Sequence, residues 1–129
     1  MERSEAYRRG EAIRTEVFGE EGVQRAQRLA KLDPGLANYI MECVWGGILS
    51  RPGLDRKTRE LITLASVTSL SQLPEVEQHV NGALNVGATK QEVIECIVQM
   101  AVYAGMPICL NAMHVAEKVF HERGLLDRE

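Results

Sequence analysis

The sequence has no Cys-x-x-Cys pair, no long uninterrupted apolar run and little excess charge of either sign. Its three cysteines, Cys43, Cys96 and Cys109, are an odd number and lie far apart in the chain. A dithiol redox centre needs two neighbouring thiols, and none stands beside the candidate proton-transfer groups identified below. The pattern fits a reducing cytoplasm, so we expect buried thiols that behave as small apolar side chains.

The composition also argues against nucleic-acid and membrane partners. The formal net charge is -3 and the basic residues are scattered among acidic ones, so the sequence shows no cluster of basic residues that would bind nucleic acid or a membrane surface. The N-terminal run MERSEAYRRGEAIR is charged and lacks the apolar core of a signal peptide. The longest apolar stretch, Ile94 to Met113, is broken by polar residues and by Gly105, which excludes a membrane span. We expect a cytoplasmic protein that binds neither nucleic acid nor a membrane.

The chain instead contains a series of segments with the helical period of 3.6 residues. Its 129 residues, 45% hydrophobic and 26% charged, are typical of one soluble domain. The β-branched residues occur singly within these patterns, so no strand is expected. We predict an all-α single domain over residues 1–129, a bundle of about six to seven helices. The expected helices cover roughly residues 4–18, 21–30, 33–45, 55–70, 74–87, 89–105 and 107–123.

Several helix ends carry specific local signals. Thr89 and Glu92 form a capping-box pattern, and Gly87 suits the left-handed residue that follows a helix. Gly105 and Pro107 are expected to separate the last two helices.

The helix that begins after Thr89 is apolar over more than one stripe, which indicates burial on two sides. In so small a domain, a subunit interface is expected to bury the second side of this helix, so we predict a homo-oligomer.

Two side chains could transfer protons, Glu60 and His79, each at the edge of an apolar helix face. Taken alone, Glu60 also fits a solvated charge in the first turns of its helix. His79 likewise fits a core-edge histidine that is hydrogen-bonded to Glu75, one turn before it. The small residues Gly82 and Ala83 leave room beside the imidazole for helix packing or for a ligand.

Three further residues are candidates for substrate binding. Arg51 lies in the Ser-Arg-Pro-Gly turn, where binding groups are often displayed. Trp45 and Tyr103 lie near glycines that could shape a pocket, with a role in the core as the alternative. We predict no metal, because the two histidines on the last helix, His114 and His121, are too far apart to chelate one ion well.

The order of these segments resembles the carboxymuconolactone decarboxylase family, within the alkyl hydroperoxidase D-like fold. Each matching piece is short, but together they span nearly the whole chain in the family order. The pieces are Tyr7-Arg-Arg-Gly10, Trp45-Gly46, Ser50-Arg-Pro-Gly-Leu-Asp55, Thr58-Arg-Glu-Leu-Ile62, His79 with Gly82-Ala-Leu-Asn85, Ala101-Val-Tyr-Ala-Gly105 with Pro107, and His114-Val-Ala-Glu117.

The resemblance implies a ring-shaped homotrimer or homohexamer and a cofactor-free decarboxylase. The family reaction converts 4-carboxymuconolactone to 3-oxoadipate enol-lactone and carbon dioxide, in protocatechuate breakdown. A small carboxylated lactone is therefore the expected partner. The resemblance implies that His79 is the general acid and that Glu60 orients or recharges it. Arg51 would hold a substrate carboxylate, with Trp45 and Tyr103 lining the pocket.

Two alternatives remain at this point: a thiol-dependent antioxidant and a non-catalytic binding oligomer. The hydroperoxidase relatives carry Cys-x-x-Cys-x-x-x-His, and here Gln72 and Glu75 stand where those cysteines would lie. This chain also departs from the decarboxylase pattern, which often has His-x-Arg-Gly-Ala-Leu-Asn where Asn81 stands here. A Gly-Arg pair that often precedes the histidine helix is replaced by the run Ser69-Leu-Ser-Gln72.

Overall fold

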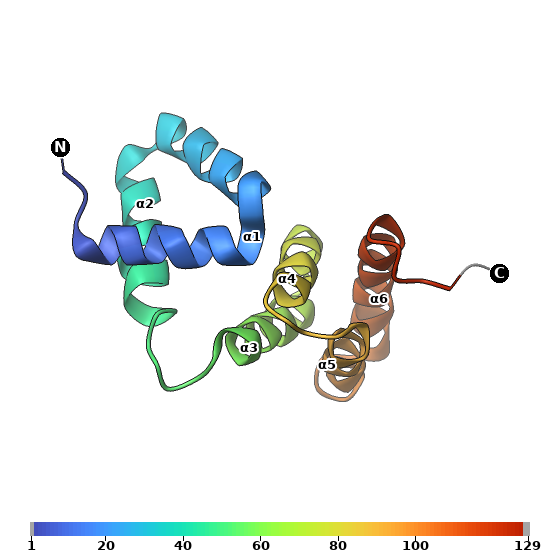
Figure 1. Cartoon of the computed structure of the whole chain (residues 1–129). Coiled ribbons are helices and arrows are strands. Elements are labelled where there is room, and N and C mark those ends of the chain that lie inside the picture. The colour runs from blue at the N-terminus through green and yellow to red at the C-terminus, as the bar shows by residue number, and fades with distance from the viewer. Residues whose placement is uncertain (1, 128–129) are drawn as a thin grey trace. The chain divides into compact units, whose positions relative to one another are not determined.

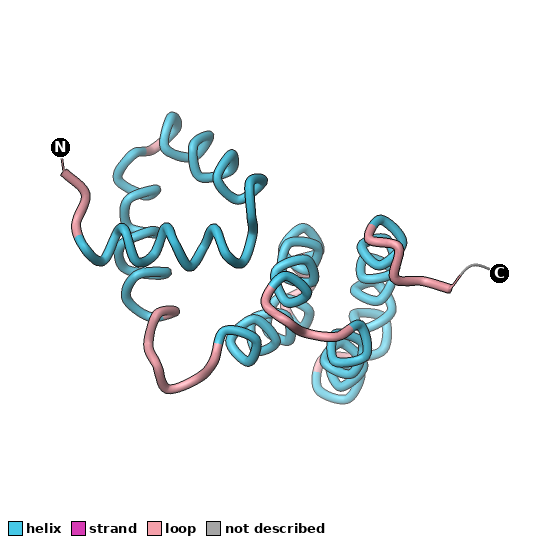
Figure 2. Tube along the Cα trace, viewed as in Figure 1, coloured by secondary structure: helices cyan, strands magenta, loops and turns pink. Residues whose placement is uncertain are grey.

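The computed structural model describes residues 2–127 of the chain. This part is all-helical and contains no strand, which confirms the predicted fold class (Figure 2). The elements are α1 (Glu5–Leu32), α2 (Pro34–Tyr39), the π-helical segment η1 (Ile40–Ile48), α3 (Arg56–Ser69), α4 (Leu73–Asn85), α5 (Lys90–Tyr103) and α6 (Met106–Glu122). They group into two units, residues 1–55 and 56–129.

In the N-terminal unit, α1 bends sharply and returns toward α2 (Figure 1). The bend lies at Gly19, whose φ of 64° and ψ of -153° are non-helical and favour glycine, so α1 consists of two helical halves on either side of it, as predicted. Asp33 then caps α2, because its side chain accepts a hydrogen bond from the Leu36 amide at 3.1 Å.

The π-helical segment η1 is the main departure from the predicted helices. The sequence favours one ordinary helix from Asp33 to Trp45, whereas the structure changes to a π-helix at Ile40 and continues to Ile48. A π-helix places about one extra residue in each turn. The buried side of η1 therefore presents Met41, Trp45 and Gly46 together. No local signal distinguishes this winding from an α-helix.

A close crossing of α1 over η1 holds the N-terminal unit together. A Cβ at Gly10 would lie 1.9 Å from the Met41 carbonyl oxygen, and one at Gly46 would lie 1.9 Å from that of Ala6. The Arg9 side chain spans the same crossing, since its Nε and Nη2 donate to the Gly46 carbonyl at 3.0 and 2.8 Å. The resembling pieces around Gly10 and Gly46 are therefore the two sides of one helix crossing.

The C-terminal unit is a bundle of four helices, α3 to α6, around one core (Figure 1). The fully buried side chains come from all four helices. They include Leu64 of α3, Val76, Val80 and Ala83 of α4, Val93 and Ile97 of α5, and Ala112, Ala116 and Val119 of α6. The local predictions hold here: the Thr89–Glu92 capping box forms, Gly87 has a φ of 102°, and Gly105 with a φ of 117° separates α5 from α6.

The helix α5 buries one stripe and leaves a second apolar stripe exposed. Val93 and Ile97 are fully buried, while Val102 is 79% exposed and Tyr103 is 77% exposed. Large contiguous apolar patches mark sites of association, whereas single exposed apolar residues are common on protein surfaces. The homotrimer or homohexamer stays a prediction for this unit. Within residues 2–127 no helix is long and apolar enough to cross a membrane.

Candidate active site

The candidate site lies in the C-terminal unit, where α3 packs against α4. Glu60 is in the second turn of α3 and shares its buried side with Leu64 and Thr68, at helical spacing. His79 is near the middle of α4, on the stripe that also buries Val76 and Val80. The buried faces of two helices thus each contribute one ionisable group.

The turn between α3 and α4 sets which residues meet. It closes with the Gln72 amide donating to the Val67 carbonyl at 3.0 Å and the Ser71 amide to the Thr68 carbonyl at 3.0 Å. Ser71 takes a left-handed conformation with a φ of 55°, which closes the helix end in the usual way. This tight turn folds α4 back along α3 and brings His79 opposite Glu60.

Glu60 and His79 form a buried hydrogen-bonded pair. The distance from His79 Nδ1 to Glu60 Oε2 is 2.7 Å, and the two residues are 8% and 3% exposed. The solvated-charge alternative for Glu60 is therefore wrong, because α4 covers the side chain and supplies its partner. A carboxylate can only accept, so Nδ1 donates and the second proton position of the ring is Nε2.

Glu75 occupies the other side of the imidazole ring. Its Oε2 lies 3.6 Å from His79 Nε2, beyond a hydrogen bond but within ion-pair distance when the imidazole is protonated. The predicted alternative, a core-edge histidine held by Glu75, is thus replaced by a histidine between two carboxylates. Glu75 is half-exposed and Glu60 is buried, so Glu60 is the better-placed of these two carboxylates to fix the ring orientation.

Two of the three predicted substrate contacts, Trp45 and Arg51, belong to the N-terminal unit, and Tyr103 belongs to the C-terminal unit. Trp45 is 6% exposed and packs edge-on against Phe18 in the N-terminal unit, with ring centres 5.4 Å apart. Arg51 lies in the exposed loop after η1. Tyr103 ends α5 and is highly exposed. The substrate-binding role of all three residues stays a prediction.

Position 81, where the family often has arginine, does not face the candidate site. Asn81 is two residues after His79, about half a helical turn around α4. Its side-chain oxygen accepts from Arg123 Nε at 2.8 Å, and Arg123 Nη2 also donates to Asn85 Oδ1 at 2.7 Å. The asparagine therefore joins α4 to the end of α6. Sequence spacing gives no sign of this link, because the partners are 42 residues apart.

The thiols are less buried than the sequence analysis expects. Cys109 is buried, but Cys96 is half-buried and Cys43 is exposed. Cys43 is two residues from both Met41 and Trp45, about half a π-helical turn from the buried side of η1. The Cys96 thiol donates to the Leu61 carbonyl at 3.2 Å, and burial raises the pKa of this thiol.

We expect one fast thiol per chain in labelling with a chromogenic disulfide at pH 8. Cys43 should react first, because it is exposed. Cys96 should react more slowly, because a raised pKa lowers its thiolate fraction, and Cys109 should react only on unfolding. The replacement Cys43→Ser should remove the fast phase. Three equally fast thiols would contradict this order.

Comparison with known proteins identifies the family of this chain. Residues 34–118 match the model of the carboxymuconolactone decarboxylase family, a range that includes Glu60 and His79. The chain belongs to this family. It is 39% identical over 126 residues to the 4-carboxymuconolactone decarboxylase of Acinetobacter baylyi, covering 97% of this chain and 94% of the relative.

A second relative extends the range of substrates in the family. The nitrosuccinic acid decarboxylase of Metarhizium robertsii is 39% identical over 115 residues, covering 88% of this chain and 80% of the relative. The two relatives are thus named for the loss of carbon dioxide from two chemically different acids.

Among residues 2–127, no three or more His, Cys, Asp or Glu side chains gather where they could hold one metal ion.

Proposed function

We propose that this protein is a cofactor-free decarboxylase of a small carboxylated substrate, with 4-carboxymuconolactone or a related carboxylated lactone as the first candidate. The observation that carries the proposal is the buried Glu60–His79 pair, 2.7 Å apart, in a chain that resembles two decarboxylases over most of its length.

The two named substrates share the chemistry that such a site needs. In each, a carboxylate can leave from a carbon that an electron-withdrawing group activates: the conjugated lactone carbonyl in one and the nitro group in the other. The bond to the carboxylate breaks and its electron pair moves into that group, as a dienolate or a nitronate. One proton must then be returned to carbon. No electron leaves the substrate, so the protein need supply only orientation, a dry site and a proton.

In the proposed mechanism His79 supplies that proton from Nε2. Glu60, on Nδ1, holds the ring in one tautomer and stabilises the imidazolium before the transfer. Glu75, 3.6 Å from Nε2, adds a second negative charge beside the protonated ring. Solvent then restores the proton to Nε2. Arg51 is our proposed partner for a substrate carboxylate, because arginine binds carboxylates through two parallel hydrogen bonds.

The test is turnover of freshly prepared 4-carboxymuconolactone and of nitrosuccinate by the purified full-length protein. We expect release of carbon dioxide from at least one of them, followed together with the loss of the substrate's ultraviolet absorbance. An absence of carbon dioxide from both would contradict the proposal. Consumption of an organic hydroperoxide in the presence of a dithiol would support the thiol-dependent alternative instead.

A further inference from the structure

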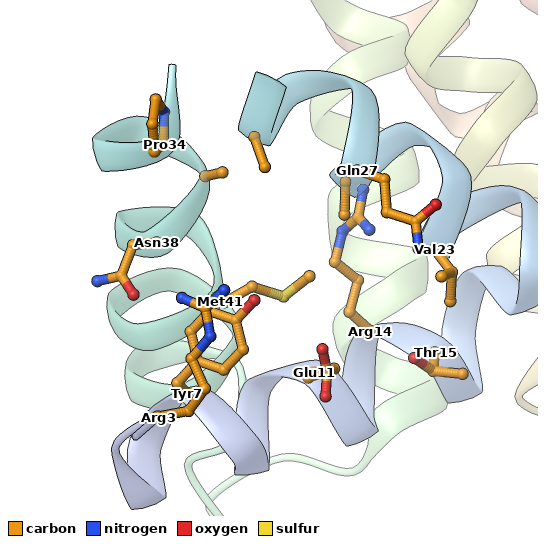
Figure 3. Close-up of a pocket in the computed structure, with 13 residues that line it drawn as sticks. Arg3, Tyr7, Glu11, Arg14, Thr15, Val23, Gln27, Pro34, Asn38 and Met41 are labelled. Atoms are coloured by element: carbon orange, nitrogen blue, oxygen red, sulfur yellow. The ribbon is translucent and has the colours of Figure 1, made fainter. Parts of the chain in front are cut away.

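The N-terminal unit contains a cavity that the proposed decarboxylase mechanism does not use. It lies where α1 bends back toward α2 and η1, and its volume is about 280 Å³ (Figure 3). Apolar side chains such as Val23, Ala37 and Met41 line part of it, while Arg3, Tyr7 and Arg14 supply polar groups. A concave apolar space with a few polar groups is the usual form of a small-molecule site.

Arg14 gives the wall of this cavity an unneutralised positive charge. Its guanidinium is half-buried, donates to the Gly22 carbonyl and lies over the Phe18 ring, 5.5 Å from the ring centre. In the described part of the chain it makes no ion pair. Arg25 lies over the same ring at 4.9 Å but is paired with Glu21 at 3.1 Å. Burial, and secondarily the charge of Arg25, lower the pKa of Arg14.

Such an arrangement favours an anion in the cavity. A half-buried guanidinium has lost hydration and gains free energy when a carboxylate replaces the lost water. Arg3, which lies 4.3 Å from the centre of the Tyr7 ring, adds a second cation at the same cavity. Glu11 also lines the cavity and forms no ion pair among the described residues, so it disfavours a second negative charge on the ligand. A single carboxylate is the charge that fits.

The volume limits the rest of the ligand. At about 30 Å³ for each water-sized group, the cavity has room for about nine such groups. Benzoate has about that number of non-hydrogen atoms, and its ring would pack on the apolar wall. We propose that this cavity is a binding site for a small organic monocarboxylate with an apolar body. The site lies in a different unit from Glu60 and His79, so it does not depend on the proposed function.

Benzoate binding to the full-length protein, measured by titration calorimetry, tests the proposal. We expect saturable binding, and at least tenfold weaker binding of the neutral analogue benzamide, because only the carboxylate pairs with Arg14. Arg14→Gln should weaken benzoate at least tenfold. The matched control Arg28→Gln removes an exposed arginine of the same helix that does not line the cavity, and should leave the affinity unchanged.

Two further variants locate the ligand even if Arg14→Gln fails to fold. Ala37→Leu should fill part of the cavity and abolish benzoate binding while the helical content is kept. His79→Gln should bind benzoate as wild type does, since the candidate active site is separate. The proposal is overturned if benzoate does not bind at up to about 10 mM, or if binding survives Ala37→Leu but is lost in His79→Gln.

Discussion

Replacing His79 by glutamine is expected to lower kcat by about 10²–10⁴-fold, the usual contribution of a general acid. Glutamine can still occupy the space beside Glu60 and accept or donate a hydrogen bond, but it cannot deliver a proton to carbon. Substrate binding does not require that proton, so KM should change much less than kcat. The measurement is steady-state decarboxylation with whichever of the two acids the wild type turns over.

The chain provides matched controls for this variant. It has three histidines, and the other two, His114 and His121, are exposed on α6. His114→Gln and His121→Gln should both keep kcat within about threefold of wild type. A change of less than threefold in His79→Gln, with the helical content intact, would remove His79 from the role of acid.

Glu60→Gln separates the role of the pair from that of the histidine alone. In the proposed mechanism Glu60 does not touch the carbon that is protonated and acts through His79 Nδ1 as a positioning residue. An amide at this position can hold the ring in the wrong tautomer, and the comparable change in a serine protease triad costs about 10⁴-fold. We expect a loss of about 10²–10⁴-fold and an altered pH profile of kcat. An unchanged pH profile would indicate a structural role only.

Replacing Gly46 by alanine is expected to lower the free energy of unfolding of the N-terminal unit by about 3 kcal/mol or more, at the upper end for overpacked sites. The added Cβ would lie 1.9 Å from the Ala6 carbonyl oxygen, which is backbone and cannot rotate away. Separating α1 from η1 would also break the two hydrogen bonds from Arg9 to the Gly46 carbonyl.

Gly47 is the control for this prediction. A Cβ there meets only the Glu42 carbonyl oxygen, at an ordinary 3.6 Å, so Gly47→Ala should be neutral or slightly stabilising. Denaturant unfolding followed by the fluorescence of Trp45, the only tryptophan, reports on this unit. Equal stability of the two variants would show that the crossing of α1 and η1 is looser than the structure indicates.

The bend at Gly19 connects these results to the proposed monocarboxylate site. Arg14 and Val23, which line the cavity, lie on opposite halves of α1, and the bend allows both to face it. The crossing at Gly46 fixes Met41, on a third wall, through the same η1 segment. Gly46→Ala should therefore weaken benzoate binding as well as stability, whereas His79→Gln should leave benzoate binding unchanged.

Local sequence signals determined much of the fold and offered both members of the candidate site as candidates. The capping box at Thr89 and Glu92, the left-handed Gly87 and the break at Gly105 are short-range features, so their physical meaning can be read without knowing what packs nearby. The family resemblance, carried by motifs along the whole chain, strengthened the prediction for Glu60 and His79 and implied their roles. From spacing alone, Glu60 could be either a solvated surface charge or a functional residue.

Only the tertiary structure decided the features that depend on distant contacts. The burial of Glu60 follows from the way the turn at Ser71 folds α4 over α3, and η1 packs closely against α1 in a π-helical winding that its own sequence does not signal. The exposure of Cys43 was likewise visible only in the structure. The sequence shows that Arg14 is charged, but only the folded chain, with its bend at Gly19, places this residue in the wall of a cavity. The burial of a side chain and the charges around it depend on segments that are distant in the sequence, so local sequence patterns do not reveal them.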